Sequence, residues 1–103
     1  MPEAASGRSN RWLTCLLIDR SARGVTPERL RLALEAHNIE SRPIWKPLHL
    51  QPLFRGCRTL GGSVSEDIFR RGLCLPSGSD MREADVARVS KIVAKTLASR
   101  RAA

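Results

Sequence analysis

Residues 42–54, RPIWKPLHLQPLF, contain several side chains that could bind a charged or sugar-like ligand. Lys46 and His49 supply hydrogen-bond donors that suit phosphate or sugar oxygens, and Trp45 supplies a flat apolar face. Arg42 can pair with a phosphate or, alternatively, with an acidic neighbour. We therefore predict that Arg42, Trp45, Lys46 and His49 are substrate-binding residues.

Prolines make this proline-rich segment (residues 42–54) stiff. Each proline fixes its own φ, removes an N–H donor and favours extended geometry in the residue before it. Side chains that are held before binding lose less entropy on binding. The prolines are Pro43, Pro47 and Pro52.

Structural roles compete with binding roles for these residues. Trp45 is of a type that more often packs in a core, and His49 of a type that more often makes a structural hydrogen bond. His37 shares the apolar side of a predicted helix, which favours a structural role. His49 and Cys57 lack the further ligands of a metal site, and Ser77 lacks the base and orienting acid of a nucleophile. We predict no catalytic residue and no metal site.

The length and charge of the chain limit the classes of function. The chain has 103 residues, which suits one small domain, and a net charge of +8. Its arginines are scattered and have no aromatic platform between them, so we expect a solvated basic surface and no specific nucleic-acid binding. No apolar run approaches the length of a membrane span and no signal peptide is evident, which favours a cytoplasmic protein.

The three cysteines do not form a recognisable metal or redox motif. Cys15 and Cys74 each lie in an apolar run, where a cysteine behaves as a small hydrophobic residue. Cys57 lies in a predicted loop. We expect all three to be structural and unpaired, because disulfides are rare in a reducing compartment.

The first half of the chain predicts a strand, a helix and a second strand. Residues 11–19 form an apolar run that favours a strand buried on both faces. Thr26, Pro27 and Glu28 are typical of a helix start, and Asn38 can adopt the left-handed conformation that stops a helix. The apolar face of this helix should carry Leu30, Ala33, Leu34 and His37. Residues 39–45 predict a strand whose Pro43 favours an edge or end position.

The second half predicts a helix, a strand and a longer helix. Ser63 with Glu66 is a capping-box pattern that begins a helix ending at Arg71, and residues 73–76 suit a short strand. Asp80 with Glu83 should cap the last helix. Its apolar stripe comprises Val86, Val89, Val93 and Leu97. Residues 99–103 should fray.

The element order β-α-β, loop, α-β-α predicts an α+β domain. Three strands and three helices suit a two-layer sandwich with a small three-stranded sheet and helices on one face. We expect one domain over residues 1–98, followed by the frayed tail.

Four stretches together resemble the DegT/DnrJ/EryC1/StrS family of pyridoxal-phosphate-dependent sugar aminotransferases. They are GRSNRWLTCLLID, SRPIWKPLHLQPLF, GGSVSEDIF and RRGLCLPSGSD, and the resemblance runs from about Pro2 to Leu97. It implies the small C-terminal domain of a fold-type-I aminotransferase, usually a dimer. Such enzymes transfer an amino group from glutamate to a keto sugar carried on a nucleotide, for surface polysaccharide or glycan. The resemblance also implies that residues 42–54 lie beside the mouth of the active site.

The cofactor machinery of that family has no counterpart in these residues. The Schiff-base lysine, the acid that pairs with the pyridine nitrogen and the phosphate-binding loop belong to a larger domain upstream. We therefore expect this chain to bind no cofactor and to be inactive alone, as a truncated gene product, a cloned fragment or a separate small protein. Its expected partners are the missing large domain and, in the full enzyme, a nucleotide sugar.

Two alternatives stay open. The chain could be a stand-alone basic α+β binding module for nucleic acid or a protein, or a regulatory fragment that docks on a full-length aminotransferase subunit. Without its large domain it should expose an apolar face and form a homodimer through it. That face should include Ile44, Leu48, Leu50, Leu53 and Phe54.

Overall fold

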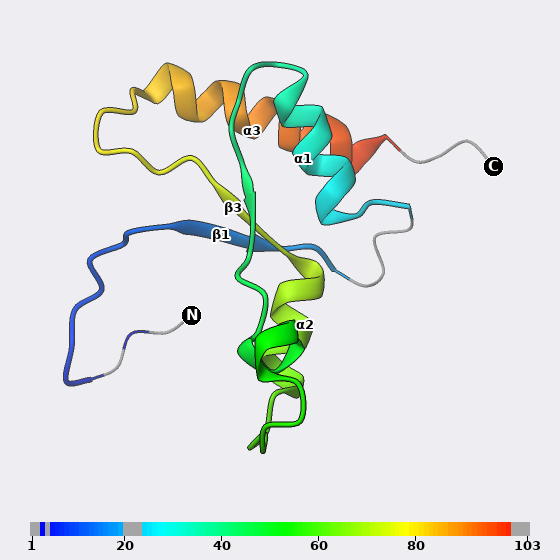
Figure 1. The fold of residues 1–103 in the computed structure, drawn as a ribbon. Helices are drawn as coiled ribbons and strands as arrows, with labels where there is room; N and C mark the ends of the chain where they lie inside the picture. Colours follow the sequence, from blue (N-terminus) through cyan, green and yellow to red (C-terminus); the bar gives the residue numbers. More distant parts are fainter. Residues whose placement is uncertain (1–2, 4, 20–23, 100–103) are drawn as a thin grey trace.

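The computed structural model describes residues 3, 5–19 and 24–99, and these residues adopt an α+β fold (Figure 1). The elements follow the chain as β1 (Thr14–Leu17), α1 (Pro27–Glu35), β2 (Arg42–Pro43), the 3-10 helices η1 (Leu48–Leu50) and η2 (Pro52–Phe54), α2 (Ser63–Arg71), β3 (Gly72–Leu75) and α3 (Glu83–Ala98). The predicted fold class and element order are confirmed. The finer assignment to a two-layer sandwich stays a prediction, as does the domain boundary.

The sheet is antiparallel and has β3 as its central strand, in the order β1-β3-β2. β1 pairs with β3 along its whole length, with Cys15 opposite Cys74. β2 pairs with the other side of β3 through Arg42 and Pro43. Pro43 therefore lies on an edge strand, as predicted, where its missing N–H does not interrupt a ladder between two strands.

The prediction that residues 11–19 form a strand buried on both faces is wrong. Only four of these residues form β1, and β1 is an edge strand. Cys15 and Leu17 are exposed and Leu16 is half-buried, while Ile18 is buried just after the strand. The run is largely apolar, but only alternate side chains reach the core because strand side chains alternate between faces.

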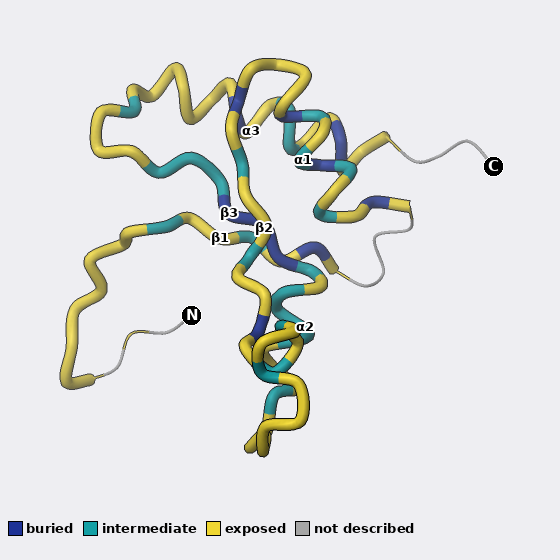
Figure 2. The backbone as a smooth tube through the Cα atoms, in the orientation of Figure 1, coloured by how far each residue is buried: buried dark blue, intermediate teal, exposed yellow. Residues whose placement is uncertain are grey.

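The core lies where α1 and α3 meet the sheet, at the buried parts of the trace in Figure 2. Leu30 and Leu34 on α1 have no exposed surface, which confirms the predicted apolar face at these positions. The buried cluster comprises Ile18, Val25, Leu30, Leu34, Ile39, Leu73 and Val89.

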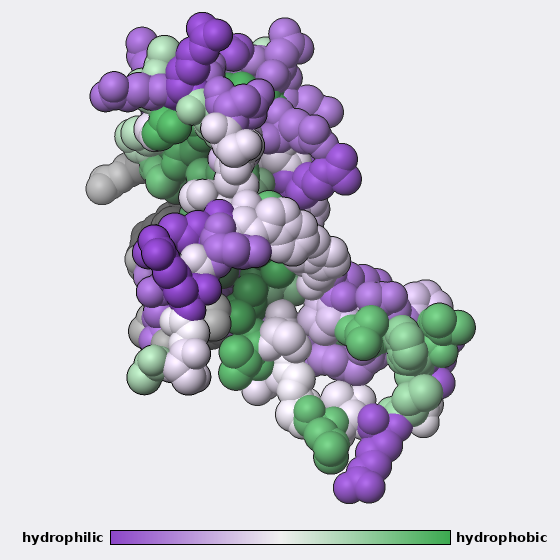
Figure 3. All heavy atoms as spheres, turned by 90° about the vertical axis from the view of Figure 1, so that its left-hand side faces the viewer, coloured by the Kyte–Doolittle hydropathy of each residue, from purple (hydrophilic) through white to green (hydrophobic). Residues whose placement is uncertain are grey.

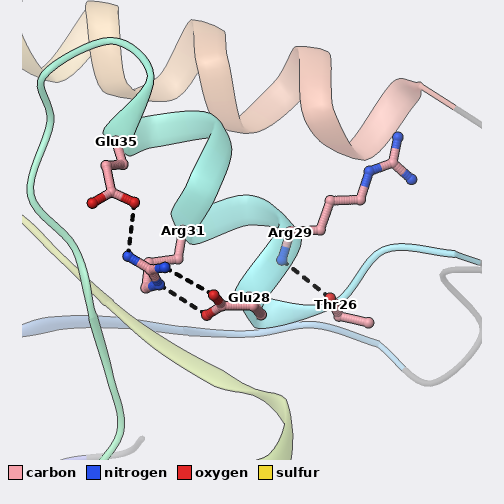
Figure 4. A network of polar contacts seen from close by, with 5 residues as sticks. All are labelled: Thr26, Glu28, Arg29, Arg31 and Glu35. Carbon is pink, nitrogen blue, oxygen red and sulfur yellow. Dashed lines mark hydrogen bonds and ion pairs between the residues drawn. The ribbon is translucent and has the colours of Figure 1, made fainter.

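The predicted signals at both ends of α1 are confirmed. Thr26 is the N-cap, and its Oγ1 accepts a hydrogen bond from the Arg29 backbone N–H at 3.1 Å (Figure 4). Pro27 occupies the first helical position, where a missing N–H costs nothing. Asn38 has a φ of 55° and so adopts the left-handed conformation beyond the helix end.

Ion pairs on the surface of α1 hold its first two turns together. Arg31 donates to both carboxylate oxygens of Glu28 at 2.8 Å and to Glu35 at 3.0 Å (Figure 4). The hydrogen bond from Arg31 lowers the pKa of Glu28 and, with the charges of both acids, raises the pKa of Arg31. Such exposed pairs at helical spacing add little to the stability of a helix, because solvent screens them.

The predicted capping box at the start of α2 is wrong. Gly62 is the N-cap residue, with a φ of 110°, and no side chain caps the helix. Ser65 Oγ instead donates to the Gly62 carbonyl at 2.8 Å. The Glu66 side chain is directed to another partner, described below.

The predicted start of α3 is also displaced. The helix begins at Glu83 with Arg82 as its N-cap, so Asp80 and Glu83 do not form the cap. The carboxylate of Asp85 accepts the Arg82 backbone N–H at 3.0 Å instead. A carboxylate one turn into the helix thus performs the role that the sequence assigned to residues 80 and 83.

The predicted apolar stripe of α3 is correct only in its middle. Val89 is buried and Val93 is half-buried, but Val86 and Leu97 are exposed. Thr96 is buried in their place and donates its hydroxyl to the Ile92 carbonyl at 2.8 Å. The buried side of α3 therefore runs through Val89, Val93 and Thr96, and not through Val86 and Leu97.

The prediction that His37 lies on the apolar face of the first helix is wrong, because His37 is exposed and lies beyond the end of α1. Its backbone carbonyl accepts a hydrogen bond from the guanidinium of Arg88 on α3. Of the predicted frayed tail, only Ser99 lies within the described residues. Its Oγ donates to the Thr96 carbonyl at 2.9 Å and accepts from Arg29 at 3.1 Å.

Candidate functional site

The proline-rich segment leaves edge strand β2 and crosses to α2 in an ordered, mostly non-helical path. Pro47 is buried, and η1 and η2 follow as two single turns that share Gln51 as a capping residue. The Gln51 side-chain amide donates to the Lys46 carbonyl at 2.9 Å, which closes the segment on itself. The stiffness that the prolines predict is thus matched by local hydrogen bonds.

His49 is fixed against α2. Its Nε2 lies 2.8 Å from Glu66 Oε1, and the His49 side chain is 21% exposed. The ring also lies against Gly62, where a Cβ atom would stand 2.9 Å from His49 Cε1. The structural hydrogen bond that we weighed for His49 is therefore present, and it orients the ring for any further role.

Trp45 is not a core residue, because 64% of it is exposed. Its ring centroid lies 5.8 Å from that of Trp12, which is 67% exposed, and the planes are inclined by 43°. Aromatic pairs at this separation attract each other. The core alternative for Trp45 is wrong, and an exposed tryptophan pair takes its place.

Arg42 and Lys46 are both exposed, with different surroundings. Arg42 Nε donates to Glu40 Oε1 at 2.8 Å, so the alternative pairing with an acidic neighbour is the one present. An exposed pair of this kind contributes little to stability and exchanges readily for another anion. The backbone carbonyl of Lys46 accepts a hydrogen bond from Gln51. The Lys46 side chain itself is exposed.

A cavity of about 910 Å³ brings two of the four predicted site residues together. Arg42 and Trp45 line it, along with Trp12, Ser41 and Arg88. Lys46 and His49 are not among its lining residues, and His49 instead contacts Glu66 on α2. The volume falls in the range of about 300–1,000 Å³ that small-molecule sites occupy.

One polar atom in this cavity wall is unsatisfied. The Oγ of Ser41 is buried and has no hydrogen-bond partner among the residues that the structure describes. Buried polar atoms without a partner are rare, and each one lowers the stability of the fold.

An arm formed by η1, η2 and α2 projects away from the α1–α3 core (Figure 1). Hydrophobic residues gather on it, at the lower right of Figure 3. Of the predicted apolar face, Leu48, Leu50 and Leu53 are exposed. Ile44 and Phe54 are half-buried, so the face is smaller than predicted.

Sequence reasoning missed three residues that shape the site. Trp12 is the partner of Trp45 in the tryptophan pair. Ser77 Oγ donates a hydrogen bond to the Trp12 backbone carbonyl at 2.8 Å. Glu66 orients His49. The sequence contained signals for Glu66 and Ser77, but these were interpreted as a cap and a turn.

Residues 3, 5–19 and 24–99 contain neither a candidate metal site nor a candidate membrane-spanning helix. No three acidic, histidine or cysteine side chains lie close enough together there to hold a metal ion. Likewise, none of the helices in that part of the chain has the length and apolar character needed to span a bilayer.

Comparison with known proteins gives a family and several relatives, EpsN and GDP-perosamine synthase among them. Residues 1–94 match the model of the DegT/DnrJ/EryC1/StrS aminotransferase family. The chain is 50% identical over 97 residues to Bacillus subtilis EpsN, whose name is that of a pyridoxal phosphate-dependent aminotransferase; the match covers 90% of this chain and 24% of EpsN. It is 30% identical over 86 residues to GDP-perosamine synthase of Caulobacter vibrioides, covering 84% of this chain and 23% of that protein. The chain thus spans about a quarter of the length of these relatives.

Proposed function

Because this chain belongs to the DegT/DnrJ/EryC1/StrS aminotransferase family, we propose that it is the small C-terminal domain of a pyridoxal-phosphate-dependent sugar aminotransferase. Its substrate would be a keto sugar carried on a nucleotide, aminated for a surface polysaccharide or glycan. The similarity to GDP-perosamine synthase, whose name refers to a sugar carried on GDP, supports this substrate class. The relatives' greater length supports a requirement for a larger domain.

The lysines of this chain do not fit the cofactor. Pyridoxal phosphate needs a lysine in a desolvated pocket and a partner for its ring nitrogen. Lys46, Lys91 and Lys95 are all exposed. We therefore assign no cofactor chemistry to this chain and propose that it transfers no amino group alone.

The cavity lined by Trp45 and Arg42 is the observation that carries the proposed substrate role. An exposed tryptophan pair offers an apolar wall to a sugar or base, and the Arg42 guanidinium can exchange Glu40 for a phosphate. Lys46 and His49, which follow Trp45 in the proline-rich segment, would contact the substrate or the large domain from outside the cavity. In this role His49 would depend on Glu66 for its orientation.

A chimera with EpsN tests the proposal. In it, this chain replaces the matching segment of EpsN. We expect the chimera to retain pyridoxal-phosphate-dependent transamination of a nucleotide-linked keto sugar. Trp45→Ala and Arg42→Ala should each lower kcat/KM about tenfold or more. Val86→Ala, at an exposed position of α3, serves as the control and should leave it unchanged.

Two results would contradict the proposal. One is a folded chimera that binds pyridoxal phosphate but aminates no nucleotide-linked keto sugar. The other comes from the 103-residue chain alone, mixed with pyridoxal phosphate, reduced with borohydride and weighed by mass spectrometry. We expect no stoichiometric adduct, so a specific adduct on one lysine would overturn the assignment of the cofactor to another domain.

A further inference from the structure

Cys15 and Cys74 lie opposite each other on neighbouring strands. β1 and β3 are antiparallel with these two residues in register, and the two Sγ atoms are 3.6 Å apart. Opposed residues of an antiparallel pair have Cα atoms about 4.5–5.5 Å apart, within the range of about 4.4–6.8 Å that a disulfide spans. A bond between the sulfur atoms therefore needs rotation of side chains and no rearrangement of the backbone.

The two thiols lie on the sheet face that is turned away from the main core. Strand side chains alternate between faces, Leu73 belongs to the core cluster and Leu16 packs against it. Cys15 and Cys74 alternate with these residues and so project from the other face. Cys15 is exposed and Cys74 is buried, so an external reagent reaches Cys15 first.

We propose that Cys15 and Cys74 form a modification site, a dithiol that a small disulfide such as oxidised glutathione converts into a cross-strand disulfide. First, the Cys15 thiolate attacks one sulfur of oxidised glutathione, which forms a mixed disulfide and releases one glutathione thiolate. The Cys74 thiolate then attacks Cys15 Sγ and displaces the second glutathione thiolate. Two protein thiols are oxidised, one glutathione disulfide is reduced, and the two protein protons pass through solvent to the released thiolates.

The unequal exposure of the two thiols sets this order of events. Burial, together with the adjacent Cys15 thiol, raises the pKa of Cys74 to about 11, so only a small fraction of Cys74 is thiolate at neutral pH and external reagents react with it slowly. Once Cys15 carries glutathione, its Sγ is already the nearest electrophile to Cys74. The second step is then intramolecular and outcompetes a second external reaction.

The bond would clamp the edge strand β1 to the central strand β3. It would link residues that are 59 positions apart, which restricts the unfolded chain strongly. We expect the thermal midpoint of the oxidised chain to rise by about 10 °C. Trp12 lies just before β1 and lines the cavity that Trp45 and Arg42 also line. The same bond would therefore also restrain that side of the cavity.

The test uses the 103-residue chain in glutathione buffers with a rising share of the oxidised form. Remaining thiols are blocked by alkylation after an acid quench, and peptide mapping locates any link. We expect a link between Cys15 and Cys74. Cys57→Ser should form the same link and show the same rise in thermal midpoint, reversed by dithiothreitol. Cys15→Ser, at an exposed position, should fold and show neither.

Three results would overturn the proposal. Cys15 and Cys74 could both remain reduced, and so be alkylated, in buffers in which Cys57 already carries glutathione. Glutathione could remain on Cys15 with no internal link. The link could instead involve Cys57 while Cys74 stays reduced.

Discussion

His49 and Glu66 connect the proline-rich segment to α2 through one hydrogen bond, 2.8 Å from Nε2 to Oε1. The two residues are 17 positions apart, and their side chains are 21% and 42% exposed. This contact anchors the middle of the segment to α2, while Arg42 and Pro43 anchor its beginning to the sheet. The segment is therefore held at two points, by β2 and by α2.

Glu66→Ala should destabilise the chain by about 1 kcal/mol, because it removes the partner of a half-buried histidine. Urea unfolding of Glu66→Ala, His49→Ala and the double variant forms a double-mutant cycle. We expect a coupling of roughly 0.5 kcal/mol or more. Strict additivity would mean that the two side chains do not interact in solution.

Gly62→Ala should be more damaging than Gly61→Ala. Both glycines have positive φ, 110° and 71°, so both substitutions strain the backbone. At Gly61 the added Cβ meets nothing within 4 Å, but at Gly62 it lies 2.9 Å from the His49 ring. We expect a loss of about 1 kcal/mol for Gly61→Ala and about 2–3 kcal/mol for Gly62→Ala in urea unfolding. Equal losses would show that the ring moves aside without cost.

The start of α1 could be predicted from the sequence because its signals are local. Thr26, Pro27 and Arg29 lie within one turn, so their geometry depends on few other residues. Asn38 likewise needs only its own tolerance of positive φ. Pro43 restricts its strand to an edge whatever its neighbours are.

The partners of Glu66 and Trp45 could not be predicted in this way. Glu66 has two possible acceptor roles, the helix N-terminus three residues away and His49 at 17 positions, and a local pattern contains only the first. Trp12 meets Trp45 because β1 and β2 flank the same central strand, which places the residues beside them on neighbouring paths. Such pairings depend on the strand order, and the sequence left that order open.

The exposed leucines of the arm predict self-association. Leu53 is 84% exposed next to Leu48 and Leu50 on the adjoining turn, and monomers rarely leave such apolar patches in water. We expect a dimer in sedimentation experiments at micromolar concentration, and a monomer for Leu53→Glu. Val86→Glu, on the exposed side of α3, is the control and should stay dimeric. A monomeric parent chain would mean that the patch is too small to associate.

The basic surface predicts weak binding to nucleic acid that salt abolishes. The net charge of +8 attracts polyanions, but several arginines are already paired with acids, as Arg31 is with Glu28. Fluorescence anisotropy with oligonucleotides of different sequence should give equal affinities that fall steeply as salt rises. Tight binding at physiological salt that distinguishes sequences would favour a nucleic-acid-binding module over an enzyme domain.

Cys74 predicts a loss of stability at alkaline pH under reducing conditions. Its thiol has a pKa of about 11 in the folded chain, raised mainly by burial, against about 8.5–9 when unfolded. The folded state therefore favours the protonated thiol: the stabilisation is complete below about pH 8.5 and is lost as the pH rises toward 11. We expect the free energy of unfolding to fall by about 1–2 kcal/mol between about pH 8 and 10.5. Cys74→Ala removes the titrating thiol, so in urea titrations it should lack this part of the fall, whereas an identical pH profile for the variant would show that Cys74 is not its source.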